Sequence, residues 1–182
     1  VERLQQEAQR AGRHVVVGFK KMFFPANEKA AELMNAPDFG DCAQVLIRYP
    51  QYVPTQEEFA AWHGGERNAV VGFLDHLCHP VSLLVYLLGM PRSLYYVRSE
   101  SGAAIASFTF KSAAVASVAL THGAATNGGM ERTEIVGTAG SHVTVENNTR
   151  VTRHRSPSLE YGASPSFYAG GSDGASLVWE PE

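Results

Sequence analysis

The chain is short of cysteine, of charged residues and of any excess of one charge sign. Only two cysteines, Cys42 and Cys78, occur among 182 residues, which is too few for a disulfide framework and fits a reducing, cytoplasmic compartment. Charged residues make up 18% of the chain, and 15 basic against 18 acidic residues give a net charge of −3. Nucleic-acid binders usually carry a basic excess. The composition therefore excludes a disulfide scaffold and disfavours a nucleic-acid partner.

Long uninterrupted apolar runs are also missing. Asp75, His76 and His79 interrupt the most apolar stretch, so we expect no membrane-spanning segment. Hydrophobic residues nevertheless make up 45% of the chain, which is enough to bury a core and argues against disorder. These features are typical of a folded domain with a hydrophobic core.

Residues 1–19 are predicted to form a helix followed by a strand. Apolar residues recur at spacings of three and four over 1–12, and Gly12 is placed to end that helix. The β-branched run 15–17 suits a strand buried on both faces, as in a parallel sheet. Because a helix that leads into a buried strand closes an α/β unit, we interpret 1–19 as the remnant of a preceding domain. Residues 20–182 would then be a second domain, in a chain that is a piece of a longer protein.

The second domain contains mainly helices in its first part and strands afterwards. Helices are predicted at 26–35 and 69–88, and strands at 43–49, 92–99, 103–110, 113–122, 132–137, 141–146 and 149–154. Gly, Pro and Ser mark 50–68 and 156–175 as loops. Short connections between strands force antiparallel neighbours. The pattern predicts an α+β fold, a mostly antiparallel open sheet with helices packed on one face.

The predicted helix 69–88 carries two stripes of side chains. The apolar stripe steps by three and four residues through Val70, Leu74, Leu77, Val81, Leu84 and Leu88. The polar stripe beside it contains Asp75, His79, Ser82 and Tyr86. Because Asp75 lies one turn before His79, its carboxylate can fix the tautomer of the imidazole and favour the protonated form. Such a pair suits a general base that takes a proton from a hydroxyl group, although it also occurs as a solvated couple.

Other polar residues could complete this site. Lys20 and Lys21 directly follow the predicted strand at 15–17, where ligands bind in α/β sheets, so either could hold a substrate oxygen. His63 lies on a Gly-rich loop and could close over a ligand, and His122 ends a predicted strand. Each of these side chains could equally face water.

Cys78 lies between His76 and His79, which raises the alternative of a zinc site. These three positions point to different faces of a helix, and no second Cys/His cluster has ligand spacing. We therefore predict no metal site.

Three segments, in this order, resemble motifs of the Gfo/Idh/MocA oxidoreductase family. Residues 15–26 read VVVGFKKMFFPA and are similar to the family's VGF-x-R-R-F-x-P-A segment. Residues 73–89 read FLDHLCHPVSLLVYLLG and are similar to its D-x-x-x-H-x-x-D-x-x-x-x-L-L-G helix. Residues 134–145 read EIVGTAGSHVTV and resemble its I-x-G-T-x-G hairpin. The resemblance covers about 1–155.

The resemblance implies a Rossmann domain that binds NAD or NADP, of which 1–19 would be the last helix and strand, and a C-terminal α+β domain. The implied reaction is hydride transfer between a nicotinamide and a carbinol carbon of a sugar, polyol or related compound. His79 matches the catalytic histidine that takes the hydroxyl proton, and Asp75 matches the acidic partner that orients it and contacts substrate. Lys21 falls where the family often has a substrate-binding Arg. No residue of this chain is assigned to the cofactor.

Two positions depart from the family pattern. Ser82 stands where the family usually has Asp, and Lys21 lacks the bidentate fork of Arg. The family's Glu-Lys-Pro motif and its glycine-rich pyrophosphate turn do not occur in this sequence. We therefore expect the chain alone to be inactive. A non-catalytic binding or regulatory module that keeps the fold is the alternative.

The predicted sheet also offers a surface for a partner. Small residues share one face of two neighbouring strands, namely Ala104, Ala106, Ala114 and Ala116, while Ile105 points the other way. We expect a second copy to pack on this alanine face and to form a homodimer or homotetramer.

Overall fold

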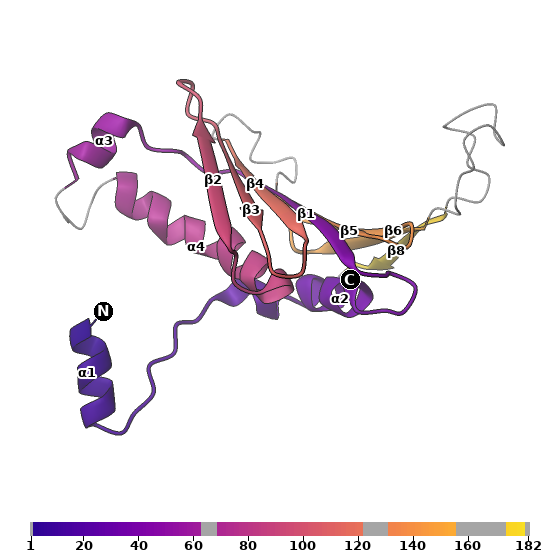
Figure 1. Ribbon diagram of the computed structural model, residues 1–182, viewed down its shortest axis with the longest axis horizontal. Coiled ribbons are helices and arrows are strands. Elements are labelled where there is room, and N and C mark those ends of the chain that lie inside the picture. The colour runs from indigo at the N-terminus through magenta and orange to yellow at the C-terminus, as the bar shows by residue number, and fades with distance from the viewer. Residues whose placement is uncertain (1, 63–68, 122–130, 156–173, 181–182) are drawn as a thin grey trace.

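The computed structural model describes residues 2–62, 69–121, 131–155 and 174–180. Helices α2 and α4 lie along one face of the sheet, and α1 lies apart from it (Figure 1). The helices are α1 (Glu2–Arg10), η1 (Lys20–Phe23, a 3-10 helix), α2 (Pro25–Met34), α3 (Gln56–Ala60) and α4 (Ala69–Leu88). The strands are β1 (Cys42–Tyr49), β2 (Ser93–Arg98), β3 (Ala104–Thr109), β4 (Val115–Leu120), β5 (Arg132–Gly137), β6 (Ser141–Glu146), β7 (Arg150–Arg155) and β8 (Gly174–Trp179).

The eight strands form one sheet in the order β2-β3-β4-β1-β5-β6-β7-β8. Neighbouring strands are antiparallel except for β1 and β4, which run parallel, with Val45 opposite Ala116. Parallel neighbours need a long crossover, and the chain between these two strands contains α3, α4, β2 and β3. The predicted α+β fold, with a mostly antiparallel open sheet, is confirmed.

The core lies between the sheet and the two helices on its face. Successive residues of a strand face opposite sides, so every second side chain enters this core. The strands contribute, among others, Val45, Ile47, Phe108, Val118, Ile135, Val143 and Val151. The helices contribute Ala26, Ala30 and Leu33 from α2 and Phe73, Leu83, Leu84 and Leu87 from α4.

The alanine face of β3 and β4 belongs to this core. Ala104, Ala106 and Ala116 are buried in the same cluster as the leucines of α4. The expectation that a second copy covers these alanines is therefore wrong, because helices of the same chain already cover them. The face of the sheet away from the helices is the open one, and it presents Ile105 and Val115, which are 53% and 45% exposed.

Helix α4 buries a different line of side chains from the predicted apolar stripe. Val70 and Leu84 are buried as expected, but Leu74 is 45% exposed, and Phe73 and Pro80 lie buried instead. The helix is apolar around most of its circumference, so its periodicity alone does not select the face that meets the sheet.

Helix α4 is also the one helix of the described residues long and apolar enough to span a membrane by length and composition, over Val70–Leu88. We expected Asp75, His76 and His79 to exclude this. Core helices pass the same test, and α4 packs against β1 and β4, which is the position of a core helix.

The N-terminal segment forms the predicted helix but not the predicted strand. Helix α1 has no buried residue. Val15, Val16 and Val17 are 57%, 85% and 66% exposed, respectively, and form no strand. A strand forms only against a partner that satisfies its backbone N–H and C=O groups, and no described strand lies beside this segment. The strand prediction at 15–17 is therefore wrong for this structure.

Two short helices were not predicted from the sequence. Helix η1 follows the exposed segment, and α3 lies within 50–68, where we predicted a loop. Helix α3 begins at a capping box, in which Thr55 Oγ1 accepts from the Glu58 amide at 3.1 Å and Glu58 Oε2 accepts from the Thr55 amide at 2.7 Å. The sequence Thr55-Gln56-Glu57-Glu58 carries this signal.

Candidate active site

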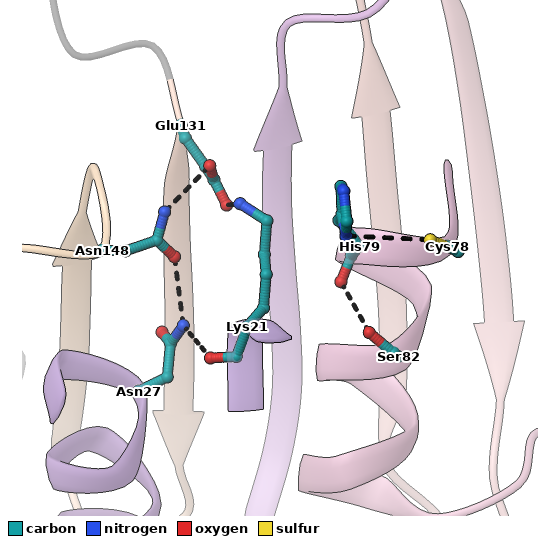
Figure 2. A network of polar contacts seen from close by, with 7 residues as sticks. All are labelled: Lys21, Asn27, Cys78, His79, Ser82, Glu131 and Asn148. Carbon is teal, nitrogen blue, oxygen red and sulfur yellow. Dashed lines mark hydrogen bonds and ion pairs between the residues drawn. The ribbon is translucent and has the colours of Figure 1, made fainter. Parts of the chain in front are cut away.

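Helices η1 and α4 bring Lys21 and His79 to the carboxyl end of β1. Helix η1 contacts α4, although nearly fifty residues separate them in the sequence. In Figure 2 the Lys21 side chain runs along β1 toward the end of that strand, and the His79 ring points the same way from α4. The sequence thus predicted two residues that the fold places at the same end of one strand.

Lys21 is almost completely buried and pairs with Glu131. Only 4% of the residue is exposed, and its ammonium donates to a carboxylate oxygen of Glu131. The same ammonium lies 5.0 Å from the centre of the Tyr49 ring, within the range of a cation–π contact. Sequence spacing gave no sign of Glu131, which lies 110 residues further on. The positive charge of Lys21 is therefore compensated inside the chain.

Two asparagines complete the surroundings of this ion pair (Figure 2). Asn27 Nδ2 lies 2.8 Å from the carbonyl oxygen of Lys21 and 3.0 Å from Asn148 Oδ1. Asn148 Nδ2 in turn donates to Glu131 Oε2 at 3.0 Å. Asn148 has φ 57°, a left-handed backbone that asparagine tolerates better than most residues. The network joins η1, α2 and the turn between β6 and β7.

The imidazole of His79 is partly buried, and its surroundings lower its pKa, which favours the neutral form. Its pKa is lowered first by burial and then by the charges of Lys20 and Lys21, which together outweigh the opposing effect of Asp75. As the sequence suggested, Asp75 favours the protonated form, but burial and the two lysines outweigh it. A neutral imidazole is the state that can accept a proton, so the change is compatible with a general base.

Asp75 acts on His79 through its charge. Its carboxylate is exposed, and no hydrogen bond between Asp75 and His79 occurs among the described residues. His79 Nδ1 instead lies 3.7 Å from Cys78 Sγ. Ser82, at the position where an Asp was expected, donates from its hydroxyl to the His79 carbonyl at 3.0 Å.

The remaining candidates are distributed differently. Lys20 is exposed, and it acts on His79 through its charge. His63 and His122 lie outside the described residues. No group of three or more possible metal ligands occurs within the described ranges, and the thiol of Cys78 donates to the Asp75 carbonyl at 2.8 Å.

Tyr49 belongs to this site although the sequence did not single it out. It shares the core-facing side of β1 with Val45 and Ile47 and ends that strand. Burial, followed by the charges of Glu131, Cys78 and Asp75, raises the pKa of Tyr49 to about 12. The hydroxyl therefore stays protonated and can donate a hydrogen bond throughout the neutral range. The sequence signal that could have found Tyr49 is its position, because a tyrosine at the end of a predicted strand, directly before Pro50, places a hydroxyl at the edge of the sheet.

A groove of about 440 Å³ opens beside these residues. Its lining is formed by Tyr49, Pro50, Gln51, Tyr52, Gly72, Phe73 and His76. His79 is not in this lining, but the ring centres of His76 and His79 are 6.4 Å apart. The groove therefore begins one side chain away from the candidate base.

The structure is therefore an α+β sheet domain with a candidate site at the carboxyl end of β1. There, His79 has a lowered pKa, and the charge of Lys21 is paired with Glu131. The sequence profile of the GFO/IDH/MocA C-terminal domain matches residues 27–143. This is more than half of the chain, which therefore belongs to the GFO/IDH/MocA family. No curated protein sequence gives a significant match.

Several solved structures share this fold. A dehydrogenase from Chromobacterium violaceum is 20% identical with a TM-score of 0.71, over all of this chain and 51% of that one. A levoglucosan dehydrogenase in complex with NADH and levoglucosan is 17% identical with a TM-score of 0.66, over 92% and 47%. A UDP-N-acetylglucosamine 3-dehydrogenase from Acidithiobacillus ferrooxidans is 15% identical with a TM-score of 0.62, over 100% and 52%. The chain spans about half the length of these proteins.

Proposed function

We propose that the whole protein is an NAD(P)-dependent oxidoreductase that moves a hydride between a nicotinamide and a carbinol carbon of a sugar or polyol. The observation that carries this proposal is the position of His79 at the end of β1, beside a groove with polar and aromatic walls, where burial and two lysines lower its pKa. Membership in the family supports it, as do solved neighbours described as dehydrogenases of levoglucosan and of a UDP-sugar.

The cofactor would be NAD or NADP, and this chain does not supply its main binding site. The sequence contains no G-x-G-x-x-G turn between a strand and a helix, which is what cradles a pyrophosphate. The residues present therefore do not fit the dinucleotide. When bound by the rest of the protein, a nicotinamide supplies the acceptor or donor of the hydride.

His79 would act as the general base of the oxidation. Its unprotonated ring nitrogen takes the hydroxyl proton while the C–H electron pair leaves the same carbon as hydride, so that a carbonyl forms. Asp75 opposes the lowering of the His79 pKa and would stabilise the imidazolium that results. Lys20 is the exposed cation of the η1 pair, and in this proposal it contacts a substrate oxygen.

Lys21 would help to shape the site, since its ammonium is already paired with Glu131. A substrate oxygen would meet Lys21 only together with the carboxylate. The sequence suggested that Lys21 alone binds a substrate oxygen. In this proposal the Lys21–Glu131 pair binds it instead. His63, which the sequence suggested could close over a ligand, is proposed as a further substrate contact.

The test is the rate of hydride transfer in the full-length protein carrying His79→Ala. Loss of a general base typically costs about 10²–10⁴ in rate, so kcat should fall in that range while cofactor affinity stays unchanged. His142→Ala, on the open face of β6, is the matched control and should retain activity. Near-normal turnover of His79→Ala would remove this residue from the mechanism.

A non-catalytic binding module is the second candidate, and the Lys21–Glu131 pair is the observation that favours it. A cation that is compensated inside the chain contributes less to substrate recognition than a free Arg would. Full-length protein that binds a sugar but oxidises none with either nicotinamide would support this candidate.

We also propose that two or four copies assemble through the open face of the sheet. Tyr95, Val97, Ile105 and Val115 lie on that face, by register, and are between 45% and 71% exposed. The burial of such a patch by a second copy would remove it from water.

A further inference from the structure

The sulfur of Cys78 lies against one ring nitrogen of His79. Cys78 Sγ is 3.7 Å from His79 Nδ1, and the far end of the ring points away from Cys78 (Figure 2). Successive residues of a helix point about 100° apart, so neighbouring side chains do not normally face each other. The ring therefore leans toward Cys78. Asp75, one turn away on the same stripe, forms no hydrogen bond to it in the described part of the chain.

The thiol hydrogen of Cys78 is directed at a different atom. Cys78 Sγ lies 2.8 Å from the backbone carbonyl oxygen of Asp75, and a carbonyl oxygen can only accept. A thiol has one hydrogen, and the carbonyl is much the closer of its two neighbours, so the hydrogen lies on the side of Asp75. Sulfur lone pairs then face the imidazole.

These lone pairs decide which nitrogen of the neutral ring carries the hydrogen. A neutral imidazole has one N–H and one bare nitrogen, and the hydrogen bond at one nitrogen sets the state of the other. A protonated Nδ1 can donate to the sulfur, whereas a bare Nδ1 would place two sets of lone pairs against each other. The hydrogen therefore stays on Nδ1, and Nε2 is left bare.

We propose that Cys78 is a positioning residue that holds His79 with its hydrogen on Nδ1, so that Nε2 takes the substrate proton. The proposal rests on the proposed function. During the oxidation Nε2 gains the hydroxyl proton and Nδ1 keeps its own, so the imidazolium still donates to the sulfur. The contact thus survives the proton transfer. The sequence gave the task of fixing the tautomer to the Asp75 carboxylate, and in this proposal the thiol performs it instead.

Heteronuclear NMR of the ring nitrogens tests this without substrate. Full-length protein labelled at histidine is measured well above the His79 pKa, and His79→Gln identifies the signals of this ring. We expect the parent ring to carry its hydrogen on Nδ1. Cys78→Ala should shift the ratio of the two tautomers toward the Nε2–H form by about threefold, as the loss of one weak hydrogen bond does. A parent ring protonated at Nε2, or an unchanged ratio in Cys78→Ala, would overturn the proposal.

Two further variants separate this role from a purely structural one. Cys78→Ser keeps one donor and an acceptor at this position, so it should keep the parent tautomer. Asp75→Asn keeps the backbone carbonyl that orients the thiol, so it should leave the tautomer ratio unchanged while it lowers the His79 pKa. A ratio that shifts in Asp75→Asn and stays constant in Cys78→Ala would return the role to the carboxylate.

Turnover of the full-length protein gives a second readout. Cys78→Ala should lower kcat in proportion to the share of the ring that keeps its hydrogen on Nδ1, with KM for the sugar near the parent value. Cys42→Ala is the matched control and should retain the parent kcat, because Cys42 begins β1 and so lies at the opposite end of that strand. A changed tautomer ratio with an unchanged kcat would show that Nε2 is not the nitrogen that reacts.

Failure of this inference can be told apart from failure of the proposed function. If the ring is protonated at Nδ1 and this depends on Cys78, but the protein transfers no hydride, the effect of the thiol on the ring stands and the enzymatic proposal fails. If His79→Ala abolishes turnover while Cys78→Ala changes neither the tautomer nor kcat, the enzymatic proposal stands and Cys78 has no positioning role.

Discussion

Lys21 and Glu131 form an ion pair that joins the segment before α2 to the beginning of β5 across 110 residues of sequence. The side chain of Lys21 is 5% exposed and that of Glu131 is 16% exposed, so water compensates neither charge effectively. A pair of this kind fixes geometry, because either charge alone would be costly in the same place.

Glu131→Gln should therefore destabilise the fold strongly. It leaves the Lys21 ammonium buried without a counter-charge, and the free energy of unfolding should fall by about 3 kcal/mol. Urea denaturation measures this. Glu134→Gln, which breaks a half-exposed pair with Arg132, is the control and should cost less than about 1 kcal/mol.

The double variant Lys21→Met/Glu131→Leu separates the cost of an unpaired buried charge from the cost of the lost hydrogen bond to Asn148. Replacement of both charges by apolar groups should recover most of the loss, because the cost arises from an unpaired buried charge. A double variant that is as unstable as Glu131→Gln would mean that the hydrogen bonds to Asn148 matter more than the charge.

His79 should titrate below the ordinary histidine pKa. Burial, Lys20 and Lys21 lower its pKa, so Lys20→Gln should raise it and Asp75→Asn should lower it further. NMR titration of the ring protons measures all three values. An unchanged or lowered His79 pKa in Lys20→Gln would mean that the Lys20 ammonium lies too far from the imidazole to act on it. An unchanged or raised His79 pKa in Asp75→Asn would mean the same for the Asp75 carboxylate.

The same lowered pKa makes His79 a source of acid instability. The unfolded chain binds a proton at the ordinary histidine pKa, whereas the folded chain binds it only at lower pH. Between those two values unfolding takes up a proton, so the contribution lowers stability as pH falls through this window and vanishes above it. His79→Gln should flatten this part of the stability profile, as followed by chemical denaturation at stepped pH.

Gly137→Ala and Gly72→Ala should change stability in opposite directions. A Cβ at Gly137 would lie 2.2 Å from the Phe39 carbonyl oxygen, whereas a Cβ at Gly72 meets nothing within 4 Å. Overpacking at Gly137 should cost about 1–3 kcal/mol. Loss of a helix glycine at Gly72 should add up to about 1 kcal/mol. Thermal melts of both variants check the sign, and equal effects would contradict the close approach of β5 to Phe39.

Ile105→Glu should dissociate the proposed assembly. A carboxylate in the centre of the apolar patch would be buried without a partner in the interface, so light scattering should show a monomer where the parent is a dimer or tetramer. Lys111→Glu, exposed between β3 and β4, should leave the mass unchanged. A monomeric parent protein would end this proposal.

The local pattern of apolar residues was sufficient to predict most of the helices and strands of this protein. Alternation of apolar residues located β1 to β7, and apolar spacing located α1, α2 and α4, because both depend on contacts that lie near each other in the sequence. The same pattern, with the family resemblance, drew attention to Asp75, His79 and Lys21. It also gave the mostly antiparallel α+β fold, since short hairpins leave strands little choice of neighbour.

Contacts between distant segments decided the rest. The face of α4 that meets the sheet, the parallel pairing of β1 with β4, and the ion pair of Lys21 with Glu131 all join residues far apart in the chain. The run Val15–Val17 has the composition of a buried strand and remains exposed, because composition supplies no partner for its backbone. Sequence thus determined most of the segments that become helices and strands, while tertiary packing decided whether 15–17 pairs as a strand and which side chains meet, because strand pairing, burial and charge compensation depend on neighbours that only the fold assembles.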